Sequence, residues 1–363
     1  MRFPGFTDDW KEKTIGDVTS IGSGRDYKHL DAGDIPVFGT GGYMLSVNDY
    51  LYEGETVFIG RKGTIDKPFW YSGKFWTVDT LFYTFDFKGV LPIFIYNQFL
   101  RINWKLYNEA SGVPSLSKAT IEKIKIKYPS LAEQEKISSF LSLVDERINI
   151  QNKIIDNYLS FLKGLTKTHY DSCTTLHSVK IKDLGEPYTV MNLSKEQLSD
   201  SGVPCILYGE LFTQYGPVIE DVISKTNVTT NLTLSRGNDL LFPSSTTVDA
   251  LSLIAPSALT KPNVVLGGDM FGIKVSDEYS PKYLSYYFNY IGKRDMAKYA
   301  IGSTIIHLHY KDIVDHSIQI PSIGEQKSFV KLASSVKLKI DAEESILHNL
   351  TVMKEYLLQK LFI

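Results

Sequence analysis

The chain has 363 residues, of which 43% are apolar, and a net charge of −2. It is long enough for two or three domains with sizeable cores, but the charge excludes DNA binding driven by overall basicity. The two cysteines, Cys173 and Cys205, have no metal-type spacing and do not indicate an oxidising compartment. No apolar run approaches a membrane span and the first residues lack an apolar signal region. We therefore expect a cytoplasmic protein without membrane contact.

The first part of the chain predicts a mixed α/β domain over residues 1–128. Residues 21–90 are rich in glycine and aromatics, and their short apolar runs predict strands separated by glycine turns. Residues 91–107 predict a helix with Pro92 in its first turn. After a loop that begins A-S-G-V-P-S-L at Ala110, apolar and charged residues alternate over 121–128, which predicts a strand.

Residues 129–168 predict one long helix. Ser130 and Glu133 have the spacing of a capping box. Apolar residues then recur at alternating intervals of four and three, with one polar residue, Gln151, at the midpoint. This is a heptad seam, which is typical of a helix packed along its length against another helix. Its apolar members are Ile137, Leu141, Val144, Ile148, Ile155, Tyr158, Leu162 and Leu165.

The same order of features returns in the second half, with a second domain over 169–320 and a second long helix over 321–363. P-S-I-G-E-Q from Pro321 repeats P-S-L-A-E-Q from Pro129 at an offset of 192 residues, and residues 313–320 repeat the alternating strand pattern. Lys354 interrupts the second seam, and a small rotation that brings in Met353 and Ile346 is expected to compensate. The chain is thus predicted to be a tandem duplication. The second seam consists of Phe329, Ala333, Val336, Ile340, Leu347, Leu350, Leu357 and Leu361.

Two like helices of one chain predict an antiparallel coiled coil with a pseudo-twofold axis. In that arrangement Gln151 meets Glu343, its equivalent at the 192-residue offset, and Ile137 lies near Leu357. Two similar but non-identical domains at a fixed separation suit an asymmetric two-part target. DNA, which rises about 34–36 Å per turn, is a ligand of that kind.

Several motifs resemble the specificity subunit of type I restriction–modification systems. They are R-F-P-G-F from Arg2, T-I-G-D-V from Thr14, G-E-T-V-F-I-G-R-K-G-T-I from Gly54, and P-S-L-A-E-Q-E-K-I from Pro129 with V-D-E-R-I from Val144. The second copy departs from the family pattern, because it lacks the alanine before Glu325 and has K-L-K-I from Lys337 in place of D-E-R-I.

The resemblance implies a division of labour. Each domain would read one half of a bipartite double-stranded DNA sequence. The long helices would hold the domains apart and dock two methyltransferase subunits, while translocation and cleavage would belong to a further subunit of the complex. The residues expected to serve docking and spacing are Glu133, Gln134, Ile137, Asp145, Arg147, Gln151, Glu325, Gln326 and Glu343.

Polar and glycine-rich loops supply the candidate DNA contacts. Arg61 and Lys62 form a basic turn after a strand, and arginine can read guanine bidentately. The second copy has uncharged hydroxyl residues there, from Ser244. The glycines of F-G-T-G-G-Y from Phe38 allow close backbone approach. The full set is Lys28, His29, Thr40, Gly41, Gly42, Arg61, Lys62, Thr64, Tyr208, Ser244, Ser245, Thr246, His307 and His309.

His307 and His309 favour a DNA-facing or packed pair over a metal site, and two aspartates favour structural roles. His307 and His309 lie on one face if they belong to a strand, but two histidines with no third ligand make a weak metal site. Asp79 and Asp269 each stand in an apolar run of their own repeat, so a structural role in each domain is favoured over an acidic catalytic pair.

No catalytic motif is recognisable in the sequence. The chain lacks the N-P-P-[YF] and F-x-G-x-G motifs of adenine methyltransferases, a P-loop, a nuclease P-D…[DE]-x-K arrangement and a G-x-S-x-G elbow. We therefore expect a non-catalytic binding subunit without cofactor or metal. Two alternatives remain open at this point, a coiled-coil protein-binding scaffold and an enzyme with an unrecognised active site.

Overall fold

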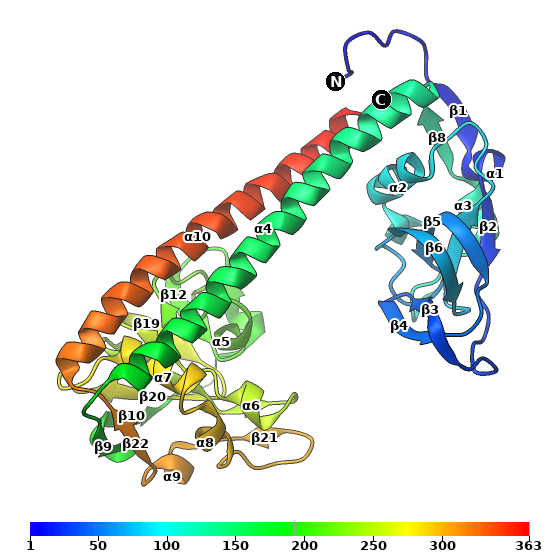
Figure 1. Cartoon of the computed structure of the whole chain (residues 1–363). Helices are drawn as coiled ribbons and strands as arrows, with labels where there is room; N and C mark the ends of the chain where they lie inside the picture. The colour runs from blue at the N-terminus through cyan, green and yellow to red at the C-terminus, as the bar shows by residue number, and fades with distance from the viewer. Residues whose placement is uncertain (192, 363) are drawn as a thin grey trace. The chain divides into compact units, whose positions relative to one another are not determined.

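The computed structural model describes residues 1–191 and 193–362, which form two compact units (Figure 1). Unit 1 comprises Met1–Lys153 and Glu344–Ile363, and unit 2 comprises Ile154–Glu343. Each unit combines β-sheets, short helices and one part of each of two long helices. The predicted mixed α/β fold with two tandem domains, a long central helix and a long C-terminal helix is confirmed.

Unit 1 is built on a six-stranded sheet. Its strand order is β2 (Ser20–Ser23), β7 (Leu81–Phe85), β5 (Tyr52–Gly60), β6 (Phe69–Thr77), β3 (Ala32–Gly39) and β4 (Gly42–Val47). Only β3 and β6 pair in parallel. A second, two-stranded sheet pairs β1 (Lys11–Thr14) with β8 (Lys125–Tyr128). The helices of this unit are α1 (Ile15–Val18), α2 (Pro92–Arg101), η1 (Trp104–Tyr107) and α3 (Lys118–Lys123).

The main core of unit 1 joins the sheet to both long helices. Phe94 and Phe99 of α2 are fully buried in it, together with Ile137 and Leu141 of the central helix. Leu361 and Phe362, which follow α10, complete this core, since the ring of Phe362 lies 5.1 Å from that of Phe94. These two residues are therefore part of the packing of unit 1.

Unit 2 contains two five-stranded sheets. One has the order β10 (Gly185–Thr189), β20 (Met270–Val275), β16 (Asp239–Pro243), β18 (Ser257–Leu259) and β13 (Val218–Ile219). The other has the order β11 (Leu198–Ser199), β14 (Lys225–Thr226), β12 (Val203–Leu207), β19 (Pro262–Gly267) and β15 (Thr233–Arg236). Two strand pairs join β9 (His177–Lys180) to β22 (Ser317–Ile320) and β17 (Ser245–Thr246) to β21 (Ile306–His307). The helices are η2 (Ile181–Asp183), η3 (Lys195–Gln197), α5 (Glu210–Thr213), α6 (Ala250–Leu253), α7 (Pro281–Tyr290), α8 (Lys293–Ala297) and α9 (Tyr310–Ile313).

The two units share a series of equivalent elements, as a duplicated sequence predicts. The β1–β8 pair of unit 1 corresponds to the β9–β22 pair of unit 2. The strands β2-β7-β5 correspond to β10-β20-β16, which have the same order and the same antiparallel pairing. Helix α2 corresponds to α7, and both begin with proline at the first helical position. The parallel pair β3–β6 of unit 1 corresponds to the parallel pair β12–β19 of unit 2, which belongs to a separate five-stranded sheet there.

The long helices α4 (Leu131–Ser172) and α10 (Ile323–Lys360) are each continuous. Their predicted seams lie on the packed face, since every seam position is buried or half-buried. In unit 1 the two helices run antiparallel, because Asp145 near the start of α4 bonds to Lys354 near the end of α10. Within the described residues, no helix combines the length and apolarity that crossing a membrane requires.

The prediction that the second helix rotates to bring Met353 and Ile346 into the seam near Lys354 is wrong. Met353 and Ile346 stay exposed at 41% and 40%. Lys354 keeps its seam position, where its ammonium group forms an ion pair with the Asp145 carboxylate. A charge at this position is tolerated because the facing helix supplies the opposite charge.

The strands predicted over 121–128 and 313–320 are wrong in their first halves. Residues 118–123 form α3, and only Lys125–Tyr128 form β8. In unit 2, α9 and a turn likewise precede β22. The physical reason is an N-cap, since the Ser117 hydroxyl accepts a hydrogen bond from the Thr120 N–H and starts a helix.

The helix predicted over 91–107 is also shorter than expected. Helix α2 ends at Arg101, and a separate 3-10 turn, η1, follows at Trp104–Tyr107. The Trp104 indole N–H donates to the carbonyl of Phe99 at 2.8 Å, and the ring is almost fully buried. Burial of this large side chain turns the backbone back toward α2.

Candidate nucleic-acid interface

The basic turn of unit 1 is held by backbone bonds on two sides. Arg61 follows β5, and its N–H donates to the carbonyl of Thr80 at 2.8 Å. Its own carbonyl accepts from the Leu116 N–H at 2.9 Å, and Gly63 N–H donates to Pro114 at 2.8 Å. The turn therefore lies between the loop before β7 and the loop that begins at Ala110.

Beside this turn unit 1 has a hollow of about 510 Å³. Arg61 and Lys62 line it and are exposed, and the Arg61 guanidinium donates to the Asp79 carbonyl at 3.2 Å. The glycine turn between β3 and β4 lies near, because a Cβ added to Gly63 would come within 3.7 Å of the Thr40 hydroxyl. The hollow is lined by Ser23, Arg61, Lys62, Asp79, Thr80, Phe82, Glu109, Ser115, Leu116, Ser117 and Lys118.

The remaining candidates of unit 1 have different places. Thr40 and Gly41 form the tip of the β3–β4 turn, and Gly42, the first residue of β4, has φ +101°. The Thr64 carbonyl lies against Gly60, and a Cβ there would clash with it at 2.0 Å. Lys28 and His29 are exposed on another loop, where the His29 ring packs edge-on to Trp76 at 5.6 Å, and neither lines the hollow.

Unit 2 repeats the same arrangement around Ser244. The Ser244 N–H donates to the Asp269 carbonyl at 2.7 Å, and its carbonyl accepts from the Leu308 N–H at 2.9 Å. These two bonds match those that Arg61 makes with Thr80 and Leu116. Ser244 is therefore the structural equivalent of Arg61, as the sequence register of the two glycine-led strands predicts.

The hollow beside Ser244 has a volume of about 950 Å³. It combines aromatic walls with charged groups, and its lining residues are Pro187, Tyr188, Thr189, Val190, Ser244, Gly268, Asp269, Met270, Phe271, His309, Tyr310 and Lys311. Ser245 and Thr246 continue from it as β17, paired with β21. Tyr208 packs over Gly268 and is partly exposed.

The two histidines meet, although not as one strand face. His307 belongs to β21, whereas His309 is the N-cap residue of α9. Their rings stack with centroids 5.9 Å apart, and His307 Nδ1 lies 4.0 Å from the Asp269 carboxylate. No group of three metal-ligating side chains occurs among the residues that the structure describes.

One wall of the unit 2 hollow rests on a buried polar pair. The Tyr188 hydroxyl donates to the Asp239 carboxylate at 2.8 Å, and the Arg236 guanidinium lies over the Tyr188 ring at 4.4 Å. Burial raises the pKa of Asp239 above its ordinary value, although its hydrogen bonds with Tyr188 and the Arg236 backbone oppose that shift. The pair fixes the tyrosine ring that lines the hollow.

Sequence reasoning missed several lining residues. Asp269, Tyr310 and Lys311 in unit 2 and Lys118 in unit 1 face these hollows, although Asp269 was expected to be structural. The duplication could have identified these residues. Once the residues around the loop are known in one repeat, the equivalent positions in the other repeat are expected to line the second hollow.

Comparison with known proteins identifies the family of this chain. The family model described as type I restriction modification DNA specificity domain matches residues 7–157 and 175–352. The chain belongs to this family. The type I restriction enzyme MjaVIII specificity subunit of Methanocaldococcus jannaschii is 23% identical over 327 residues, which are 81% of this chain and 73% of that protein.

Two solved structures have the same fold as this specificity-family chain. The type I restriction-modification S subunit from M. genitalium aligns with a TM-score of 0.59 and 16% identity, over 100% of this chain and 99% of that one. A chain from a study of complex assembly and conformational transition in the type I R-M system aligns with a TM-score of 0.56 and 12% identity, over 98% and 97%.

In this specificity-family chain, two residues of the predicted docking and spacing set anchor the long helices. Gln134 is fully buried, and its Oε1 accepts from the N–H of Leu91, the residue that precedes α2, at 2.9 Å. Gln326 does the same in unit 2, accepting from the N–H of Ser280 before α7 at 2.9 Å. Each glutamine thus joins a long helix to the proline-led helix of its own unit.

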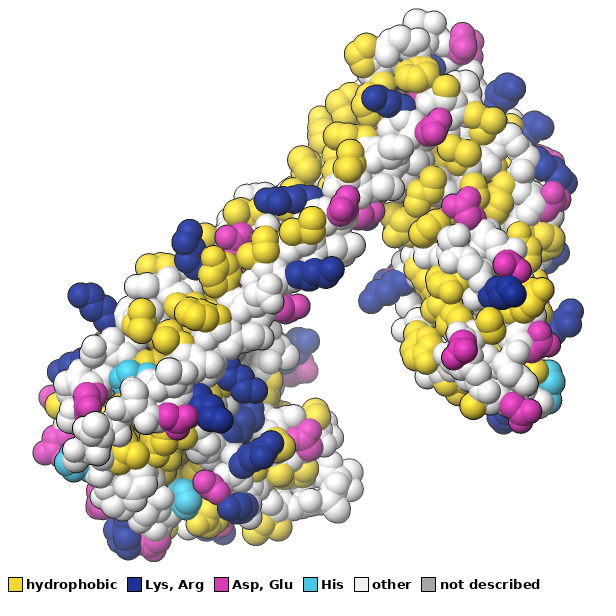
Figure 2. All heavy atoms as spheres, in the orientation of Figure 1, with side chains coloured by type: hydrophobic (Ala, Val, Ile, Leu, Met, Phe, Trp, Pro, Cys, Tyr) yellow, Lys and Arg dark blue, Asp and Glu magenta, His cyan; other side chains and the backbone are white. Residues whose placement is uncertain are grey.

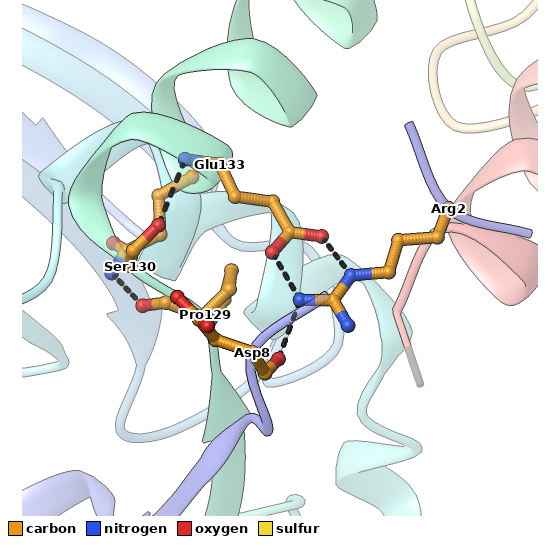
Figure 3. Close-up of polar contacts among 6 residues, drawn as sticks. Arg2, Asp8, Pro129, Ser130 and Glu133 are labelled. Atoms are coloured by element: carbon orange, nitrogen blue, oxygen red, sulfur yellow. Dashed lines mark hydrogen bonds and ion pairs between the residues drawn. The ribbon is translucent and has the colours of Figure 1, made fainter. Parts of the chain in front are cut away.

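The capping boxes of the two long helices differ. Glu325 closes its box by accepting from the Ser322 N–H at 3.0 Å. The Glu133 N–H donates to the Ser130 hydroxyl, but the Glu133 carboxylate does not close the box, because it accepts two hydrogen bonds from Arg2 at 2.8 Å each (Figure 3). Arg2 also donates to the Asp8 carbonyl, so this guanidinium ties the first residues of the chain to α4 (Figure 3).

The other predicted helix residues divide by exposure. Ile137 and Gln151 are buried in the seam, which fits a spacing role. Arg147 is exposed, while Asp145 and Glu343 are half-buried. Basic and acidic side chains intermix over both units in the face that Figure 2 shows.

Proposed function

We propose that this chain is the DNA-recognition subunit of a type I restriction–modification complex and reads a bipartite, asymmetric target. Residues 1–128 read one half-site and residues 169–320 read the other. The observation that carries the proposal is the pair of equivalent hollows. The same backbone bonds build both, yet their linings differ in charge and aromatic content. Such a pair suits two different half-sites.

The chemistry belongs to partners. Two methyltransferase subunits dock on the chain, and a restriction and translocation subunit joins through the complex. The absence of a recognisable catalytic motif in the sequence supports a non-catalytic role. The long helices, residues 129–168 and 321–363, act as the spacer between the half-sites. The pairing of Gln151 with Glu343 stays a prediction, and cysteines at these two positions should cross-link under mild oxidation.

Charge supports a dependence on partners for affinity. Residues 169–321 carry 12 basic and 16 acidic groups, a net charge of −4. Such a segment releases few counterions from DNA. The isolated chain should therefore bind DNA weakly, and methyltransferase subunits should raise its affinity by adding phosphate contacts.

Methylome sequencing of cells that carry the chain and its methyltransferase subunits tests the proposal. The expected result is one methylated motif with two specified halves and an unspecified spacer. Replacing residues 1–128 by the matching domain of a relative should change one half only. A change in both halves, or no bipartite motif with the original chain, would contradict the proposal.

A further inference from the structure

The two hollows differ in charge at the turn residue and at the residue whose carbonyl accepts its N–H. Unit 1 has Arg61 at the turn and Thr80 as the residue that accepts its N–H. Unit 2 has Ser244 at the equivalent turn and Asp269 as the accepting residue. At the turn, the cation of unit 1 is thus replaced by a hydroxyl in unit 2. At the accepting residue, the hydroxyl of unit 1 is replaced by a carboxylate in unit 2. This difference indicates different ligand chemistry at the two sites.

Asp269 is held in place by its backbone while its side chain remains open. Its carbonyl is fixed by the Ser244 N–H at 2.7 Å, and the preceding Gly268 has φ +92°. Tyr208 lies so close that a Cβ on Gly268 would meet its ring at 2.6 Å. The Asp269 side chain is 46% exposed and lines the hollow, with His307 as its nearest ionic neighbour at 4.0 Å.

A carboxylate at a DNA-facing site favours one kind of base contact. Ionised aspartate only accepts hydrogen bonds and is repelled by phosphate, so its useful partner is an amino group on a base edge. Adenine presents the acceptor N7 beside its N6 amino group in the major groove, which a carboxylate cannot satisfy. Cytosine presents the N4 amino group alone, and aspartate accepts from it.

We propose that Asp269 is a specificity-determining residue that accepts a hydrogen bond from the N4 amino group of a cytosine in the half-site read by unit 2. This inference rests on the proposed function. Arg61, at the turn of unit 1, reads a guanine in the other half-site. The two halves of the target therefore differ in which base the charged residue of each hollow contacts.

The test uses the full chain, in complex with its methyltransferase subunits, carrying Asp269→Asn or Asp269→Ala. Methylation rates are measured on a set of DNA duplexes in which each position of the motif is varied in turn. Asp269→Ala should reduce discrimination at one G·C position of the unit 2 half-site by roughly 5- to 150-fold. Asp269→Asn should move the preference at that position toward adenine, because an amide both donates and accepts. Asp277→Asn removes the same charge from an exposed residue outside the hollow and should change nothing.

Three results would overturn the inference. They are relaxation at an A·T position, a uniform loss of methylation across all sequences, and unchanged specificity in both Asp269 variants. Failure of the proposed function has a different signature, since the complex with the unaltered chain would then methylate no bipartite motif at all.

Discussion

Replacement of Gln134 by alanine should destabilise unit 1 selectively. The buried amide joins three backbone groups, since Oε1 accepts from the Leu91 N–H and Nε2 donates to the carbonyls of Gly89 and Pro129, both at 3.0 Å. In the variant the Leu91 N–H loses this acceptor at the start of α2. The long helix also loses its polar link to that helix.

The expected loss in the free energy of unfolding follows from these contacts. A buried donor left without a partner costs about 1–3 kcal/mol. Removal of the rest of the side chain leaves space that the packed helices cannot fully close, which adds to the cost. The two carbonyls contribute less because each has a second lone pair. We expect a total of about 2–4 kcal/mol.

The chain offers a direct assay and a matched control. All four tryptophans, at positions 10, 70, 76 and 104, belong to unit 1. Tryptophan fluorescence during urea denaturation therefore reports unit 1, and Gln134→Ala should lower its midpoint. Gln326→Ala removes the equivalent contact with Ser280 in unit 2 and should leave that midpoint in place while shifting the helical circular dichroism transition. A change below about 0.5 kcal/mol in Gln134→Ala, or an equal fluorescence shift in both variants, would refute the reasoning.

Three further predictions concern other contacts. Arg61→Ala should relax one position of the unit 1 half-site by about 1–3 kcal/mol in methylation assays; a uniform loss of DNA affinity with a smaller salt slope would instead identify a phosphate contact. Lys354→Ala should lower the stability of unit 1 by about 1 kcal/mol, and adding Asp145→Asn should cost little more, as a double-mutant cycle will measure. Desolvation lowers the pKa of His169 below its ordinary 6.5, so its contribution to stability is present above that pH and is lost as pH falls through 6.5 and below. In His169→Phe the circular dichroism melting temperature should fall less between pH 7.5 and 5.5 than in the unaltered chain, and an equal fall would exclude this histidine as a source.

The parts of the fold that sequence predicts well are those set by local periodicity. A heptad seam of eight apolar positions leaves few alternatives, and α4 and α10 have the predicted faces buried. The segment from Ile121 shows the limit of such patterns. Ile121 and Ile124 are three apart, which suits one turn of helix, while Ile124, Ile126 and Tyr128 alternate as in a strand. The Ser117 cap decides where one ends and the other begins.

Long-range partners were beyond prediction. The sequences around Ser130 and Ser322 have the same capping-box spacing. Only the capping box at Ser322 closes. At Ser130 the Glu133 carboxylate binds Arg2, which lies 131 residues earlier in the chain. A local motif states which bonds are available, and competition from distant residues selects among them. A buried carboxylate with a bidentate arginine has a stronger partner than a single backbone N–H.

Sequence alone also failed to identify the place of Asp269 in the candidate site, but comparison of the two units in the structure identifies it. The sequence favoured a structural role for both Asp79 and Asp269, because each stands in an apolar run of its own repeat. The backbone hydrogen bonds show that Asp269 is instead the structural equivalent of Thr80. The carbonyl of Thr80 accepts from Arg61 in unit 1, and the carbonyl of Asp269 accepts from Ser244 in unit 2. Backbone bonds that both units keep mark what the fold requires. The side chains at these positions can differ without disturbing the shared backbone bonds, so they are the residues that can give the two units different DNA specificities.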